Sequence, residues 1–157
     1  MDKIKTMEGD LNVHDARYAI VASRFNDFIV ESLIKASLRC LRQHGASDKD
    51  IEIVRVPGAF ELPLVVRKVA ESRKFDGIIA LGAVIRGGTP HFDYVAGECV
   101  SGISAVAREQ GIPVGFGILT VDTIEQAIER AGTKACNKGE DATRAVIETV
   151  NLLRRFD

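Results

Sequence analysis

Short apolar runs alternate with amphipathic segments along most of the chain. Four of the runs are predicted to be strands: residues 17–23, 51–56, 76–81 and 113–119. We interpret them as continuously apolar rather than alternating, which is typical of strands buried on both faces. The pattern therefore favours a parallel sheet of four strands over a half-exposed antiparallel one.

The segments between and after the strands have helical periodicity. Five helices are predicted, at residues 27–44, 61–72, 94–109, 123–131 and 141–156. In the first, Ile29, Leu33, Ala36 and Cys40 recur every three or four residues, as on one face of a helix. Asn26 is the expected N-cap and Gly45 the expected stop. Strand–helix alternation of this kind predicts a parallel sheet covered by helices on both faces.

Length and charge limit the function. The chain has 157 residues, within the usual size of one domain, so we expect residues 1–157 to form a single domain. Its 21 Lys and Arg residues nearly balance 22 Asp and Glu residues. No strong field therefore favours nucleic acid or an anionic membrane surface, and we expect neither as a partner.

The cysteines and the apolar runs bear on the cellular setting. Cys40, Cys99 and Cys136 are odd in number, widely spaced and without a C-x-x-C pair. Neither a disulfide framework nor a metal site is therefore expected, and a reducing, cytoplasmic location fits best. Residues 1–10 lack the apolar core of a secretory signal, and no apolar run is long enough to span a bilayer.

The segment from Gly82 to Phe92, GAVIRGGTPHF, carries the clearest chemical signal. It follows an apolar run and precedes a helical pattern, so its glycine-rich turn would direct unpaired backbone N–H groups and the positive end of a helix dipole at one spot. Such a spot suits a phosphate. His91 lies beside it and can move protons at neutral pH. The segment predicts chemistry on a phosphorylated small molecule.

Each of the other strand ends also offers a group that a ligand could use. Arg24-Phe25-Asn26 follows the first strand, Pro57-Gly58-Ala59-Phe60-Glu61 the second, and residues 116–120 close the fourth. Ligands of open parallel sheets bind at the carboxyl ends of the strands. A flat ring, a carboxylate and a second ring are thus expected along the same edge as the phosphate turn.

Together these motifs resemble the 6,7-dimethyl-8-ribityllumazine synthase family, the riboflavin synthase beta-chain family. The resemblance covers the chain from about Arg17 to the C-terminus and is carried, besides the segments above, by Leu62-Pro63, Pro113-Val114-Gly115-Phe116-Gly117-Ile118-Leu119-Thr120, Gln126-Ala127-Ile128-Glu129-Arg130-Ala131-Gly132 and Asn137-Lys138-Gly139. It implies a three-layer α/β/α sandwich, flavodoxin-like, with a central four-stranded parallel sheet. One departure is Cys136, where relatives commonly have glycine or histidine.

The resemblance implies a transferase of the penultimate step of riboflavin biosynthesis. The family joins 5-amino-6-(D-ribitylamino)uracil to 3,4-dihydroxy-2-butanone 4-phosphate through imine formation, loss of phosphate and ring closure with loss of water. It uses neither a metal nor an organic cofactor, so no cofactor is expected for this chain.

The resemblance also implies roles for individual residues. His91 would be the proton carrier, and Gly88, Thr89 and Arg130 would bind the butanone phosphate. The ribitylaminouracil would contact Phe25, Asn26, Gly58, Ala59, Phe60, Glu61, Ala83, Val84, Ile85, Phe116 and Lys138. Lys138 is also a weaker candidate than Arg130 for the phosphate region. Phe116 would come from a neighbouring subunit.

Without the resemblance, purely structural roles stay open for several of these residues. Phe25, Val84 and Ile85 could be core residues, and Glu61 a first-turn carboxylate that favours the helix dipole. Arg130 could pair with Glu129 or be a solvated helix charge.

Assembly is a further implication, because family members form pentamers with active sites between subunits, and some pack twelve pentamers into an icosahedral shell of 60 subunits. The chain has no insertion between Gly132 and Lys138, where strictly pentameric members tend to be longer, which favours the shell. We expect residues 1–15 to be an arm that can pair with a neighbouring subunit, and riboflavin synthase is an expected partner.

Two other functional classes stay open from the sequence alone. One is a flavodoxin-like module that binds flavin or nucleotide phosphate without chemistry, although neither a G-x-G-x-x-G turn nor a Walker lysine is present. The other is a shell-forming or interaction protein that has lost catalysis. Glu61, His91 and Arg130 argue against that loss.

Overall fold

The structure, a computed structural model, describes residues 3–132 and 136–157. Strands and helices alternate through most of this part of the chain. The elements are β1 (Tyr18–Ser23), α1 (Asp27–Gln43), β2 (Ile51–Val56), α2 (Leu62–Glu71), β3 (Gly77–Ile85), α3 (His91–Gln110), β4 (Val114–Val121), α4 (Ile124–Arg130) and α5 (Lys138–Arg154). Short 3₁₀ turns at Asp48–Asp50 and Ala59–Glu61 precede β2 and α2.

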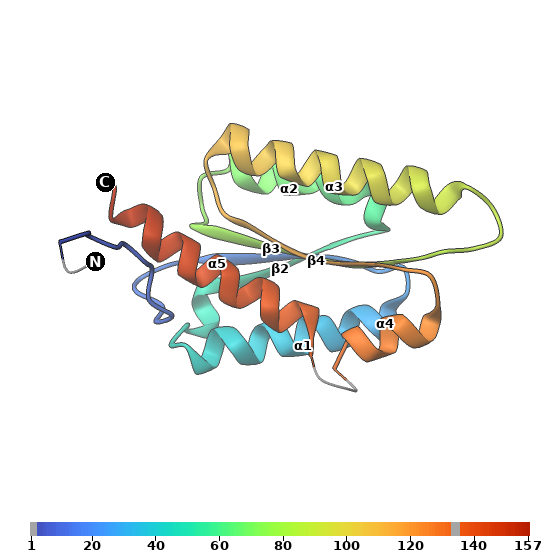
Figure 1. Cartoon of the computed structure of the whole chain (residues 1–157), viewed down its shortest axis with the longest axis horizontal. Helices are drawn as coiled ribbons and strands as arrows, with labels where there is room; N and C mark the ends of the chain where they lie inside the picture. Colours follow the sequence, from blue (N-terminus) through green and yellow to red (C-terminus); the bar gives the residue numbers. More distant parts are fainter. Residues whose placement is uncertain (1–2, 133–135) are drawn as a thin grey trace.

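The four strands form one parallel sheet in the order β2-β1-β3-β4. Helices α1, α4 and α5 lie on one face of the sheet, and α2 and α3 lie on the other (Figure 1). The predicted three-layer α/β/α arrangement with four parallel strands is confirmed. All four strands point the same way, so their carboxyl ends meet at one edge.

Two apolar layers hold the sandwich together. One packs alternate residues of β1, β3 and β4, including Ile20, Leu81 and Leu119, against α1 and α5. The other packs the intervening residues, including Val21, Ala80 and Ile118, against α2 and α3. Because side chains alternate across a strand, each strand contributes to both layers, which requires the nearly continuous apolar runs of β1 and β3.

The edge strand β2 does not follow that rule, and the expectation of continuously apolar strands is wrong there. Glu52, Ile53 and Arg55 are exposed, whereas Val56 is buried. The physical reason is position: β2 pairs only with β1, so one side of it is open to solvent.

Several element boundaries differ from the predicted ones: helix α3, for example, begins at His91, three residues earlier than predicted, and two other differences have a clear cause. Strand β3 continues through Gly82 to Ile85, which the sequence analysis assigned to the glycine-rich turn. Its pairing with β4 extends to Ile85, opposite Val121, and this partner keeps the segment extended. Helix α5 begins at Lys138, three residues earlier than predicted, because the Asn137 side chain caps it.

The expected N-terminal arm contains no helix or strand in residues 3–15. It lies along α5, where the Asn151 amide donates to the carbonyl oxygens of Asp10 and Asn12, both at 2.8 Å. Residues 1 and 2 of the arm lie outside the described residues, and pairing with a neighbouring subunit stays a prediction. None of the described helices is long and apolar enough to cross a membrane.

Candidate functional site

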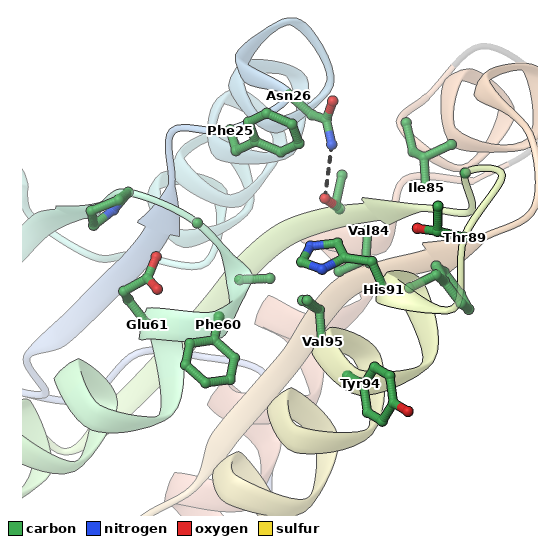
Figure 2. A pocket seen from close by; sticks show the side chains of 16 residues that line it. Phe25, Asn26, Phe60, Glu61, Val84, Ile85, Thr89, His91, Tyr94 and Val95 are labelled. Atoms are coloured by element: carbon green, nitrogen blue, oxygen red, sulfur yellow. Dashed lines mark hydrogen bonds between the residues drawn. The ribbon is translucent and has the colours of Figure 1, made fainter.

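A cavity of about 800 Å³ opens at the carboxyl ends of β1 and β3. Its walls are the β1–α1 turn, the 3₁₀ turn before α2, the end of β3 and the start of α3 (Figure 2). Its size is that of a small-molecule site. Eleven of the predicted site residues line it: Phe25, Asn26, Gly58, Ala59, Phe60, Glu61, Ala83, Val84, Ile85, Thr89 and His91.

The β1–α1 turn presents an aromatic ring and an amide. The Phe25 side chain is an exposed aromatic ring at the cavity, with 70% of the residue accessible, so it is not a core residue. Asn26 occupies the N-cap position of α1 but adopts a left-handed backbone, with φ 64° and ψ 43°, and makes no side-chain cap. Its amide Nδ2 instead donates to the Ala83 carbonyl oxygen at 3.0 Å (Figure 2). The predicted capping role is therefore wrong, and the side chain ties the turn to β3.

The second turn brings a carboxylate to the same cavity. The Phe25 backbone N–H donates to the Pro57 carbonyl oxygen at 3.0 Å, which holds the first two turns side by side. A Cβ atom on Gly58 would lie 3.3 Å from Glu61 Oε1, so the carboxylate folds back over the glycine. Glu61 makes no side-chain cap to α2. Its oxygens are therefore not committed to the helix start and can accept hydrogen bonds from a ligand.

The end of β3 forms the floor. Ala83 and Val84 are buried, with exposed fractions of 3% and 7%, and Ile85 is half-buried. Ala83 belongs to the α1 and α5 layer and Val84 to the α2 and α3 layer. They are core residues that also line the cavity, and their contact with a substrate stays a prediction.

The glycine-rich turn lies between β3 and α3. Gly87, Gly88 and Thr89 are exposed. A Cβ atom added to Gly87 or Gly88 would have no atom of the described residues within 4 Å, so internal packing does not require glycine there. An open backbone that a ligand can approach closely is a different reason for glycine at these positions.

His91 is the first residue of α3 and is exposed. Its imidazole points into the cavity near Val84 (Figure 2). A ring in that position can give or take a proton beside a bound molecule while the turn holds a phosphate. His91 therefore joins the glycine-rich turn to the rest of the site.

Arg86 clamps the glycine-rich turn instead of lining the cavity. Its Nε donates to Asp122 at 2.8 Å, its Nη1 lies 3.5 Å from Asp93, and its guanidinium lies 4.3 Å from the centre of the Phe92 ring. The hydrogen bond that Arg86 donates to the Asp122 carboxylate raises the pKa of Arg86. The turn is thus fastened to both α3 and the end of β4.

Four predicted residues do not line the cavity: Gly88, Phe116, Arg130 and Lys138. Gly88 lies between two residues that do, Gly87 and Thr89. Phe116 pairs in the sheet with Ala80, four residues before Val84. At about 3.3 Å per residue, that places Phe116 roughly 13 Å from the strand end of its own chain.

Arg130 and Lys138 lie in the layer of α1 and α5. Arg130 ends α4, and its Nη1 donates to the Gln126 carbonyl oxygen of the same helix at 3.2 Å. Lys138 begins α5, and its ammonium lies 4.0 Å from Asp141. The predicted site residues therefore form two groups: most are at the cavity, and the others lie away from the cavity of their own chain.

The sequence analysis gave no site role to Pro57, Gly87, Phe92, Tyr94 and Val95, which also line the cavity. All five adjoin or fall within the motifs that it singled out. The signal that could have found them is helical spacing, because Val95 follows His91 by one turn of α3 and so projects on the same side. Tyr94 is 73% exposed and lies at the outer rim (Figure 2).

The cavity combines an exposed ring, a free carboxylate, an imidazole and an open glycine turn. These groups suit a flat polar ring with hydroxyl groups beside a phosphate. Within residues 3–132 and 136–157, no three His, Cys, Asp or Glu side chains gather as a metal site would require.

The comparisons with known proteins point in one direction. Residues 15–154 match the family described as 6,7-dimethyl-8-ribityllumazine synthase. A protein of that name from Nitratidesulfovibrio vulgaris (strain DSM 19637 / Miyazaki F) is 55% identical over 153 residues, which cover 98% of each chain.

Proposed function

The chain belongs to the 6,7-dimethyl-8-ribityllumazine synthase family, and we propose that its cavity joins 5-amino-6-(D-ribitylamino)uracil to 3,4-dihydroxy-2-butanone 4-phosphate. The family acts as a transferase in riboflavin biosynthesis. One observation carries the assignment of the site: Phe25, Glu61, Thr89 and His91, from three separate segments, line the same cavity at the carboxyl edge of the sheet.

The pyrimidine substrate lies against the β1–α1 turn in this proposal. A flat heteroaromatic ring gains from offset stacking on Phe25, whose ring is otherwise exposed to water. Glu61 accepts hydrogen bonds from ribityl hydroxyls, and Asn26 and the segment from Gly58 to Phe60 border the ring. The backbone of Ala83, Val84 and Ile85 provides its donors and acceptors. The uncommitted carboxylate of Glu61 supports this arrangement.

The phosphate of the second substrate lies at the glycine-rich turn. Backbone N–H groups of Gly88 and Thr89 and the hydroxyl of Thr89 donate to its oxygens, close to the start of α3. Arg130 supplies a guanidinium that can bind phosphate in bidentate form, and Lys138 adds a second cation.

His91 moves the proton that the reaction requires. The amine of the pyrimidine attacks the carbonyl of the butanone, water leaves, and an imine forms. Loss of phosphate and ring closure, with loss of a second water, complete the lumazine. His91 can take a proton from the attacking amine and return one to a leaving group, while the cavity holds the two substrates together.

Assembly completes the site. Phe116, Arg130 and Lys138 lie away from the cavity of their own chain, so we propose that a neighbouring copy presents them to it. Large exposed apolar side chains that include Leu64, Val100 and Phe116 support such a contact. We propose a homopentamer, with an icosahedral shell of 60 subunits as its larger form. Light scattering separates these two sizes.

Three further expectations belong to this proposal. The chain is one domain whose residues 1–15 form an arm that contacts a neighbour. It works in the cytoplasm, where a thiol such as the exposed Cys136 stays reduced. Riboflavin synthase is its partner, which co-purification from a cell extract would test.

An assay of product formation tests the proposed reaction. The purified protein is mixed with both substrates, and the lumazine product is followed by its absorbance or fluorescence. Product must form faster than in the same mixture without protein and must require both substrates. A rate equal to the uncatalysed background would refute the enzymatic function, and bound yellow flavin without turnover would favour a flavin-binding module.

A further inference from the structure

The Asn137 side chain connects three helices. It is 7% exposed and lies between the end of α4 and the start of α5. Its Oδ1 accepts from the backbone N–H groups of Gly139 at 2.8 Å and Glu140 at 3.2 Å. Its Nδ2 donates to the carbonyl oxygens of Ala131 at 2.8 Å and Ser32 at 3.3 Å. One amide thus links α5, the end of α4 and α1.

All the hydrogen-bonding capacity of this amide is used. An asparagine side chain has two N–H donors and a carbonyl oxygen with two lone pairs, and each of the four has a partner here. Serine and aspartate can replace the acceptor half, because both are good helix N-caps. Neither can donate to Ala131 and Ser32 in the same way. The cap therefore accounts for only half of the contacts.

The Asn137 amide lies beside the two cationic residues, Arg130 and Lys138. Ala131 directly follows Arg130, and Asn137 directly precedes Lys138. Ala131 and Asn137 also form an isolated antiparallel bridge. The amide therefore brings the chain back on itself, so that the last residue of α4 and the first residue of α5 are held close in space although eight positions separate them.

Two glycines show how tight this arrangement is. Gly132 has φ +117°, and a Cβ atom there would lie 3.3 Å from Asn137 Nδ2. A Cβ atom on Gly139 would collide with the Leu33 carbonyl oxygen of α1. The start of α5 is thus pressed against α1 while the Asn137 amide fills the space beside Gly132.

We propose that Asn137 is a positioning residue for phosphate binding, which fixes Arg130 and Lys138 as one pair of cations. The inference rests on the proposed function, because that function makes these cations ligands of the butanone phosphate. Asn137 does not touch the substrate. It acts through the Ala131 carbonyl oxygen on one side and the first turn of α5 on the other.

The test uses Asn137→Ser, which keeps a neutral cap for α5 and removes the donors to Ala131 and Ser32. We expect the KM for the butanone phosphate to rise on the order of tenfold, with little change in the KM for the pyrimidine. The matched control is Ser37→Ala. It removes a buried hydrogen bond of 2.7 Å to Thr143 between α1 and α5, without touching residues 130–138. Its two KM values should stay as in the unaltered protein.

A double variant separates positioning from a merely structural effect. If Asn137 acts through Arg130, then Asn137→Ser in an Arg130→Ala background should raise the phosphate KM by much less than tenfold. Additive effects, equal rises in both KM values, or a fall in melting temperature alone would overturn the proposal. An Arg130→Ala variant with an unchanged phosphate KM would instead count against the site assignment on which the inference rests.

Gly132→Ala provides a second route if Asn137→Ser does not fold. The added Cβ strains a left-handed backbone and presses on Asn137 Nδ2 from the opposite side. We expect the same selective rise in the phosphate KM. A folded Gly132→Ala protein with both KM values unchanged would overturn the proposal.

Discussion

Asn26 Nδ2 donates to the carbonyl oxygen of Ala83 at 3.0 Å, across 57 positions of sequence. The bond joins the turn that carries Phe25 to the strand that forms the cavity floor. It also fits the left-handed backbone of Asn26, a conformation that asparagine tolerates better than most residues. The amide therefore adds to the pairing of β1 with β3 in holding the exposed ring beside the floor.

Asn26→Gly should separate the amide's role from that of the backbone. Glycine accepts φ 64° without strain, so the variant loses the side chain and its hydrogen bond but gains no backbone strain; the greater freedom of glycine in the unfolded chain adds to the loss of stability. We expect the free energy of unfolding to fall by about 1 kcal/mol and the KM for the pyrimidine to rise several-fold. Denaturant titration and steady-state kinetics measure the two effects. Asn26→Ala, which adds backbone strain, should be the less stable variant; equal stability of the two would contradict this account.

His91→Ala should slow the reaction without abolishing it. General acid–base help is typically worth about a hundred- to ten-thousand-fold, whereas holding two substrates together supplies acceleration that does not need the imidazole. We expect kcat to fall about a hundredfold and to stay above the uncatalysed rate. The control is His44→Ala, at the far end of α1, roughly 25 Å along that helix from the cavity. Unchanged kcat in His91→Ala would exclude the proton-carrier role.

Arg130→Ala should chiefly weaken the phosphate substrate. Loss of a bidentate guanidinium should raise the KM for the butanone phosphate by more than tenfold and leave the pyrimidine KM nearly unchanged. Lys138→Ala should have a smaller effect of the same kind, because an ammonium is a point charge. Arg67→Ala, which breaks an exposed pair with Glu109, is the control. Steady-state kinetics with each substrate varied in turn measure these changes, and equal effects on both substrates would contradict the assignment.

Strand boundaries that depend on neighbouring residues in the sequence could be predicted, and those that depend on distant residues could not. Tyr18–Ser23 and Ile51–Val56 were predicted to within one residue, because turn residues bound each apolar run. Gly82 to Ile85 was assigned to a turn because of its glycine. The segment is extended because it pairs with β4, and the amino acids of the segment itself do not reveal that pairing.

The residues of the site also divide into those that could be predicted from the sequence and those that could not. Residues at strand ends, such as Phe25, Glu61 and His91, could be predicted because parallel strands bring their carboxyl ends to one edge. The contact of the Asn26 amide with Ala83 and that of the Asn137 amide with Ser32 could not, because these partners lie 57 and 105 positions away. The second group, Phe116, Arg130 and Lys138, depends on a neighbouring copy in our proposal.

Tyr18 should make stability depend on alkaline pH. Burial raises the pKa of Tyr18 from 10 to about 12, and among the described residues its hydroxyl has no hydrogen-bond partner. The unfolded chain loses this proton near pH 10, before the folded protein does. The contribution of Tyr18 to the free energy of unfolding is therefore constant below pH 10. Between pH 10 and about 12 it falls by about 2 kcal/mol.

Tyr18→Phe isolates that effect from other groups that titrate at high pH. The difference in unfolding free energy between the unaltered protein and Tyr18→Phe should be flat below pH 9.5 or so and should fall above it. Because the hydroxyl is buried with no hydrogen-bond partner in the described part of the chain, the variant should be no less stable at neutral pH. Tyr94→Phe, at an exposed residue, should show no such trend. A pH-independent difference for Tyr18→Phe would contradict the raised pKa.

Mixing two impaired variants tests whether neighbouring copies share a site. In our proposal, His91 comes from one chain and Arg130 from the next, so co-assembled His91→Ala and Arg130→Ala subunits form some sites with neither defect. Activity should then exceed that of both variants alone. Phe25→Ala mixed with His91→Ala is the control, because both residues line the cavity of the same chain and every site keeps one defect. No recovery in the first mixture would place His91 and Arg130 in one chain's site, and recovery in the control would contradict the placement of Phe25 and His91 in the same chain's site.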